Sequence, residues 1–229
     1  MRGDLARSSM TKGYELWVAS RVKGRDGSHG MAHFERVRRL ALELAPLVTP
    51  PSQGHFFAPM LLELTALSHD VCDHKYVTST TAAAERELMA LELAKCGLSD
   101  SEVLAVTLAA ENVSLSKELH EGMQDEEMRR AGARWLRDVV SDADKLDALG
   151  TIGLRRLLQY NYKEYKSLRG EELAARLRFY SERHVEHRVN YLVFEESRRR
   201  GLELLREMRE AVRDVSRVAD LLRDAERSE

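Results

Sequence analysis

Two histidines and two aspartates occupy apolar faces of predicted helices, and their chemistry suits a metal ion. They are His33, His69, Asp70 and Asp144. Two imidazoles and two carboxylates are suitable ligands for a divalent ion of the Mn, Fe, Co, Ni or Zn group. Such an ion lowers the pKa of bound water toward neutrality, which makes water a competent nucleophile. If the ion is octahedral, four protein ligands leave positions open for water and substrate.

The first three of these residues each have a plain structural explanation when taken alone. His33 shares a face with a helical apolar stripe, where a single histidine is more often a hydrogen-bonded core residue than a ligand. His69 and Asp70 close the apolar segment MLLELTALSHD. A buried carboxylate there must be paired or metal-bound. The set of four is therefore more informative than any one member.

Asp144 is the aspartate that helical geometry selects in the segment RDVVSDADKLDALG. It lies four residues after Val140 and four before Ala148, so it projects from the apolar side. Asp142 is turned about 200° away, because each residue of a helix advances ~100°. Asp147 follows Asp144 by three residues and is expected to lie beside it.

Four blocks of the sequence resemble the HD-domain metal-dependent phosphohydrolases, in particular their small stand-alone members. The blocks are DGSHGMAHFERV, LSHDVCDHKY, NVSLSKE and VSDADKLDALGTIGLRR, between about residues 20 and 156. The resemblance implies an all-α HD-domain helical bundle, one divalent metal ion and hydrolysis of a phosphoester or phosphoanhydride. We expect Mn, Fe, Co, Ni, Zn or Mg, with Mn favoured. The sequence departs from many relatives at Gly30-Met31-Ala32, where those carry Asp and an aromatic residue.

Asp73 and His74, which follow the His-Asp pair in the sequence, are candidates for proton transfer. In HD hydrolases an acidic residue near Asp73 often orients or deprotonates the attacking water, and general-base catalysis contributes about 10²–10⁴ in rate. The alternative is that Asp73 caps a turn or pairs with Lys75. His74 could donate a proton to the leaving oxygen. Ser114, Ser116 and Cys72 lack a base at a readable spacing, so a covalent nucleophile is not expected.

Four basic residues are candidates for binding phosphate, with solvated surface positions as the alternative for each. All four lie in blocks that resemble the family, and Arg36 also follows His33 by one helical turn; the set is Arg36, Lys75, Lys117 and Lys145. His29 is one turn before His33, and we expect His29 and Asp147 to surround the metal ligands and orient them. Tyr160, Tyr162, Tyr165 and Tyr180 form a cluster after Gly150 that could stack on a base, although packing is the commoner role.

Helical periodicity predicts almost every element of the chain. Helices are expected over 11–23, 29–47, 56–70, 81–96, 99–111 and 125–149, with a loop over 112–124. Ser99 and Glu102 form the pattern of a capping box, and Gly97 is a helix-stop residue.

The last part of the chain predicts a long, charged, amphipathic helix. Its apolar residues follow a 4-3 spacing over about three heptads, namely Gly201, Leu205, Met208, Val212, Val215, Ala219 and Leu222. Packing on its own domain is favoured, with a partner chain as the alternative. We divide the chain into an N-terminal helix (1–24), an HD phosphohydrolase domain (25–200) and this C-terminal helix (201–229).

Net charge, cysteine count and the length of apolar runs indicate which classes of protein this chain does not belong to. The 229 residues carry 36 Lys+Arg and 38 Asp+Glu, and this net charge of −2 argues against a dedicated nucleic-acid binder. Two cysteines exclude a disulfide scaffold and favour a reducing, cytoplasmic setting. No apolar run approaches the ~20 residues that span a bilayer.

The sequence therefore predicts a phosphohydrolase acting on a nucleotide-like substrate, with a nucleoside polyphosphate favoured by the resemblance. The alternative is an HD module that binds a metal or nucleotide, as a sensor or dimerisation unit, without turnover. A homodimer is possible, and no membrane partner is expected.

Overall fold

The computed structural model describes residues 2–48, 59–73, 75–120 and 124–227, and every regular element in these ranges is helical. The all-α prediction is confirmed. The first half contains α1 (Arg2–Arg21), α2 (Met31–Leu44), the 3₁₀ turn η1 (Ala45–Leu47), α3 (Pro59–Ser68), α4 (Ser79–Lys95), α5 (Asp100–Glu111), α6 (Leu115–His120) and α7 (Asp125–Arg130). The second half contains α8 (Arg134–Asp147), α9 (Gly150–Tyr160), α10 (Tyr162–Tyr165), α11 (Gly170–His184), η2 (Glu186–Tyr191), α12 (Glu195–Ala211) and α13 (Val215–Glu226).

The start of α5 shows how local chemistry sets a boundary. The Ser99 hydroxyl accepts a hydrogen bond from the Glu102 amide at 3.4 Å, and the Glu102 carboxylate accepts one from the Ser99 amide at 2.8 Å. These reciprocal bonds satisfy two amides that the first turn leaves without partners. Gly97, at φ +81°, ends the preceding segment as expected.

Two helix predictions and one loop prediction differ from the structure. The single helix expected over 125–149 is α7 and α8, separated where Gly132 adopts φ +67°, a conformation that a continuing helix cannot contain. The expected loop over 112–124 contains α6. The helix expected over 11–23 begins at Arg2.

The expected C-terminal helix is also two helices, so its heptad pattern is not a continuous coiled-coil seam. Helix α12 ends at Ala211, and Asp214 caps α13 by accepting hydrogen bonds from the amides of Ser216 and Arg217 at 2.9 and 3.1 Å. Both helices pack on their own chain, α12 against α8 and α9 and α13 against α9 and α11.

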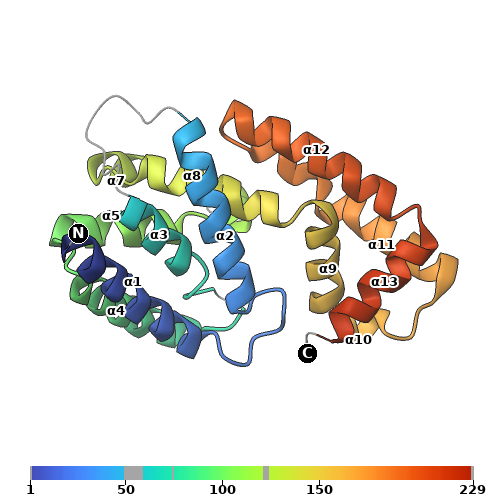
Figure 1. Ribbon diagram of the computed structural model, residues 1–229, viewed down its shortest axis with the longest axis horizontal. Coiled ribbons are helices and arrows are strands. Elements are labelled where there is room, and N and C mark those ends of the chain that lie inside the picture. The colour runs from blue at the N-terminus through green and yellow to red at the C-terminus, as the bar shows by residue number, and fades with distance from the viewer. Residues whose placement is uncertain (1, 49–58, 74, 121–123, 228–229) are drawn as a thin grey trace.

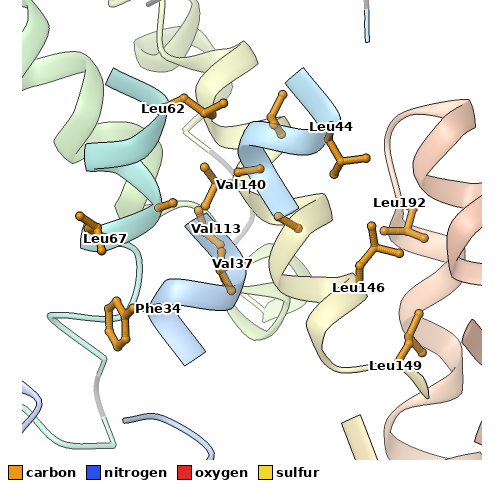
Figure 2. Close-up of a cluster of buried hydrophobic side chains, with 14 of the residues drawn as sticks. Phe34, Val37, Leu44, Leu62, Leu67, Val113, Val140, Leu146, Leu149 and Leu192 are labelled. Atoms are coloured by element: carbon orange, nitrogen blue, oxygen red, sulfur yellow. The ribbon is translucent and has the colours of Figure 1, made fainter. Parts of the chain in front are cut away.

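Helix α8 is the central element of the fold. It contacts α2, α3 and α5 on one side and α9, η2 and α12 on the other, and it runs between the two halves of the molecule (Figure 1). Figure 2 shows the apolar core that fixes it against its neighbours. These side chains are at most 2% exposed and include Phe34, Val37, Leu44, Leu62, Leu67, Val140 and Leu146. Burying each contributes roughly 1.5–3 kcal/mol, so the helices that carry the predicted ligands are held firmly.

A buried carboxylate joins α8 to the C-terminal helices. Asp142 has no exposed surface and accepts hydrogen bonds from the amides of Val193 and Phe194 at 2.8 and 3.0 Å. Burial raises its pKa above the usual value. As helical geometry predicted, it points away from Asp144. None of the helices in the described ranges combines the length and apolar character that crossing a membrane requires.

Candidate metal centre

The four predicted metal ligands meet at one point. The Nε2 atom of His33, on α2, lies 3.1 Å from Nε2 of His69, in the turn after α3. The same His33 atom is 3.6 Å from Asp70 Oδ2 and 3.5 Å from Asp144 Oδ1 on α8. His69 Nε2 is 3.6 and 4.0 Å from these two carboxylate oxygens. Three separate segments therefore bring four donor atoms together.

These separations fit a single divalent ion. Ligand atoms held about 2.0–2.2 Å from one metal lie roughly 3–4 Å from each other, which is the spacing of the five atom pairs given above. Burial works against ionisation at Asp70, yet the rings of His69 and His33 hold its pKa well below the usual value. The pKa of Asp144 is lowered by the same two rings against the same effect of burial. Both carboxylates are anionic beside positively charged rings, and a metal ion bound at Nε2 of each ring would supply that positive charge instead.

The far nitrogens of both rings are engaged, which directs the near ones to the centre. His33 Nδ1 donates to Asp147 Oδ2 at 2.8 Å, and His69 Nδ1 donates to the Ala66 carbonyl at 2.7 Å. A neutral ring that donates at Nδ1 presents its lone pair at Nε2, as a metal ligand requires. Asp147 therefore lies where the sequence predicts, against a proposed ligand.

A cavity of about 390 Å³ opens over this cluster. Asp70 and Asp144 line it, together with three further residues that the sequence predicted for the site, His29, Asp73 and Lys75. The C-terminal half of the chain lines the same cavity with Arg156, Tyr160, Tyr180, His184 and Arg188.

Three of the basic residues predicted to bind phosphate lie elsewhere. Arg36 is paired with Asp147, its Nε donating to Oδ1 at 2.7 Å, and does not line the cavity. Lys117 lines a second cavity of about 210 Å³, which also reaches Asp70. Lys145 is fully buried beneath α6, bonded to the Ser141 hydroxyl and 3.5 Å from Glu118. His74 lies outside the described residues.

Two arginines of the site were not anticipated. Arg156 Nη1 lies 3.0 Å from Asp147 Oδ2, and its Nη2 lies 3.4 Å from His33 Nε2. Arg188 lines the cavity with its Nε buried and without a hydrogen-bond partner among the described residues, and burial lowers its pKa. Arg156 ends a block that resembles the family and could have been noticed there. Arg188 lies in η2, in a segment with no motif.

The overall arrangement of helices is similar to that of known structures. An HD-superfamily hydrolase from Bacillus thuringiensis superposes with a TM-score of 0.61 at 17% identity, covering 90% of this chain and 95% of that one. This chain has the HD-domain fold. Two further structures superpose on this chain. Bacillus subtilis YpgQ in complex with ADP does so with a TM-score of 0.64 at 19% identity, covering 91% of this chain and 94% of that one. A Lactobacillus plantarum protein does so with a TM-score of 0.65 at 19% identity, covering 90% of this chain and 94% of that one. The chain matches no family model and no curated protein.

Proposed function

We propose that the chain is a divalent-metal-dependent phosphohydrolase that cleaves a phosphoanhydride or phosphoester bond of a nucleotide-like substrate. One observation supports this above all: the carboxylates of Asp70 and Asp144, each within 4.0 Å of the two histidine donor atoms, line a cavity that also carries cationic side chains. A phosphorylated substrate needs both features, because its phosphorus must be approached by water while its oxygens carry negative charge. His33, His69, Asp70 and Asp144 would hold the ion.

The roles of the other residues follow from their places. A bound divalent ion would supply Lewis acidity and lower the pKa of water. Asp73, three residues after Asp70 on the cavity wall, would accept the proton of the attacking water. Arg156, Arg188 and Lys75 would offset the charge that develops on the phosphoryl oxygens.

Two observations favour a nucleotide, and within that class we propose a nucleoside polyphosphate. Tyr160 and Tyr180 line the cavity and offer aromatic faces for a base. Bacillus subtilis YpgQ, which has the same fold, binds ADP in its crystal structure. Manganese as the ion, a cytoplasmic setting and a homodimer remain predictions from the sequence.

A substrate panel tests the proposal. The protein is stripped with a chelator, reloaded with Mn²⁺ and incubated with nucleoside tri-, di- and monophosphates and with cyclic nucleotides. We expect release of phosphate or pyrophosphate from at least one polyphosphate, and only after reloading. Retention of a nucleotide without product, at full metal occupancy and with every divalent ion tried, would favour the alternative of a binding module.

Arg188 is expected to bind the substrate phosphates and not the metal. A charged hydrogen bond contributes about 1.5–3 kcal/mol, so Arg188→Gln should raise KM roughly 10- to 100-fold. The Mn²⁺ content, measured by elemental analysis, should not change. Arg183→Gln is the matched control, because Arg183 is exposed on α11. An unaltered KM in Arg188→Gln would remove this residue from the site.

A further inference from the structure

A second group of ligand atoms lies beside the first. One atom each from His29, Asp70 and Asp73 lies within 4.8 Å of the other two. Asp70 belongs to both groups, and all three residues line the larger cavity. His29 comes from the turn before α2, while Asp70 and Asp73 come from the segment after α3. A histidine and two carboxylates form a donor set suited to a divalent ion.

The hydrogen bonds around His29 fix which of its nitrogens faces this group. The Ser28 hydroxyl donates its only proton to Asp26 Oδ1, so at 2.6 Å from His29 Nδ1 it must accept. Nδ1 therefore carries the ring proton, and the lone pair of the neutral ring is at Nε2. His29 is only 9% exposed, and its ring packs against Tyr76 and Tyr160 with centroid distances of 5.5 and 5.8 Å. These contacts fix the orientation of the His29 ring and therefore the direction of its Nε2 lone pair.

A cationic group from the chain itself lies at this position. The Lys75 ammonium nitrogen is 3.4 Å from His29 Nε2 and 3.8 Å from Asp73 Oδ2. It also lies 5.7 Å from the centroid of the Tyr160 ring, a cation–π contact. The Lys75 side chain is 41% exposed, so it can leave this position without unpacking the core.

We propose that His29, Asp70 and Asp73 form a second cation-binding position, and that the Lys75 ammonium occupies it in place of a second metal ion. Lys75 thereby keeps the centre mononuclear, because a divalent cation and an ammonium group cannot share one set of donors. The inference rests on the proposed function in one respect, namely that Asp70 also serves the first ion. It predicts that removing the Lys75 charge converts the site into a two-metal centre.

Metal content provides the test, with no reference to activity. Metal-stripped wild-type protein and Lys75→Met are titrated with Mn²⁺ by calorimetry, and bound metal is counted after gel filtration. We expect one equivalent in the wild type and two in Lys75→Met, since methionine keeps the length of the side chain without its charge. Electron paramagnetic resonance of loaded Lys75→Met should show an exchange-coupled Mn²⁺ pair, because both ions would share the Asp70 carboxylate.

Two further variants make the assignment specific. Lys95→Met removes an exposed lysine charge on α4 and should keep one equivalent. His29→Gln combined with Lys75→Met should return the count from two to one. Circular dichroism confirms that each variant is folded.

The outcomes separate this inference from the proposed function. No bound metal in the wild type would contradict the metal centre itself. One equivalent in both the wild type and Lys75→Met would overturn only the second position. Two equivalents in the wild type would show that Lys75 does not exclude the second ion. A second equivalent that persists after His29→Gln would place that ion elsewhere. Each of the last two results would also overturn the inference.

Discussion

Replacing Asp144 by alanine is expected to abolish stoichiometric metal binding and to lower kcat/KM at least about a thousandfold. Metal-ion catalysis contributes several kcal/mol to transition-state stabilisation, and each 1.4 kcal/mol is a factor of ten. Asp144 Oδ1 lies 3.5 and 4.0 Å from the two histidine ligand atoms, so its loss opens one side of the cluster. Isothermal titration with Mn²⁺ and steady-state kinetics on the same samples measure both effects.

The fold should survive this change, because the Asp144 side chain reaches the cavity and is 17% exposed. Asp220→Ala is a suitable control, since that carboxylate is 63% exposed on α13 and pairs with nearby Arg223. It should leave metal content and rate unchanged. Full metal occupancy and full activity in Asp144→Ala would contradict the assignment of this ligand, whatever the substrate proves to be.

Replacing Arg137 by methionine is expected to lower the free energy of unfolding by about 3–5 kcal/mol. The Arg137 guanidinium is fully buried and donates to the Asn112 carbonyl at 2.8 Å, to Asp138 at 3.0 Å and to Glu118 at 2.6 Å. Removing one partner of a buried ionic group leaves the others uncompensated, and this loss exceeds what the aliphatic side chain recovers. Urea unfolding of the wild type and Arg137→Met measures the change. The slope of the unfolding free energy against urea concentration is compared between the two proteins.

Arg130→Met provides the comparison. Arg130 forms an ion pair with Glu126, but the two side chains are 77% and 67% exposed, and pairs of this kind contribute about 0–1 kcal/mol. If Arg137→Met changed the stability no more than Arg130→Met, the buried network would not stabilise the fold. The network also holds α6, which follows Ser114 at the junction of the two cavities.

Much of the fold could be predicted because helical periodicity and end signals are local. Ser99 with Glu102 correctly located the start of α5. Gly132 could not be interpreted in the same way, since a helix tolerates a glycine and only its positive φ ends one. The cap at Asp214 was missed because the 4-3 apolar spacing continues through the break between α12 and α13.

The site was predictable where chemistry and helix geometry agreed, and less so where tertiary contacts decide. His33, His69, Asp70 and Asp144 converge as expected, although their role as ligands stays a prediction. Lys145 shows a limit of motif reasoning: it is adjacent to Asp144, and a rotation of ~100° per residue directs it under α6.

Arg188 shows a different limit, because its place depends on how the C-terminal half folds back over the cavity. No residue near Arg188 in the sequence indicates that its side chain reaches the cavity.

Helix α8 carries Asp144 on one face and, two residues earlier, the buried Asp142 on another. The first faces the cavity, and the second holds the amides that precede α12. An ion bound at Asp144 would therefore stabilise the anchoring of α12 and α13, although neither helix provides any of the four ligands. Occupancy at the centre and attachment of the C-terminal helices would be thermodynamically coupled, so chelation should loosen a region that the ion never touches.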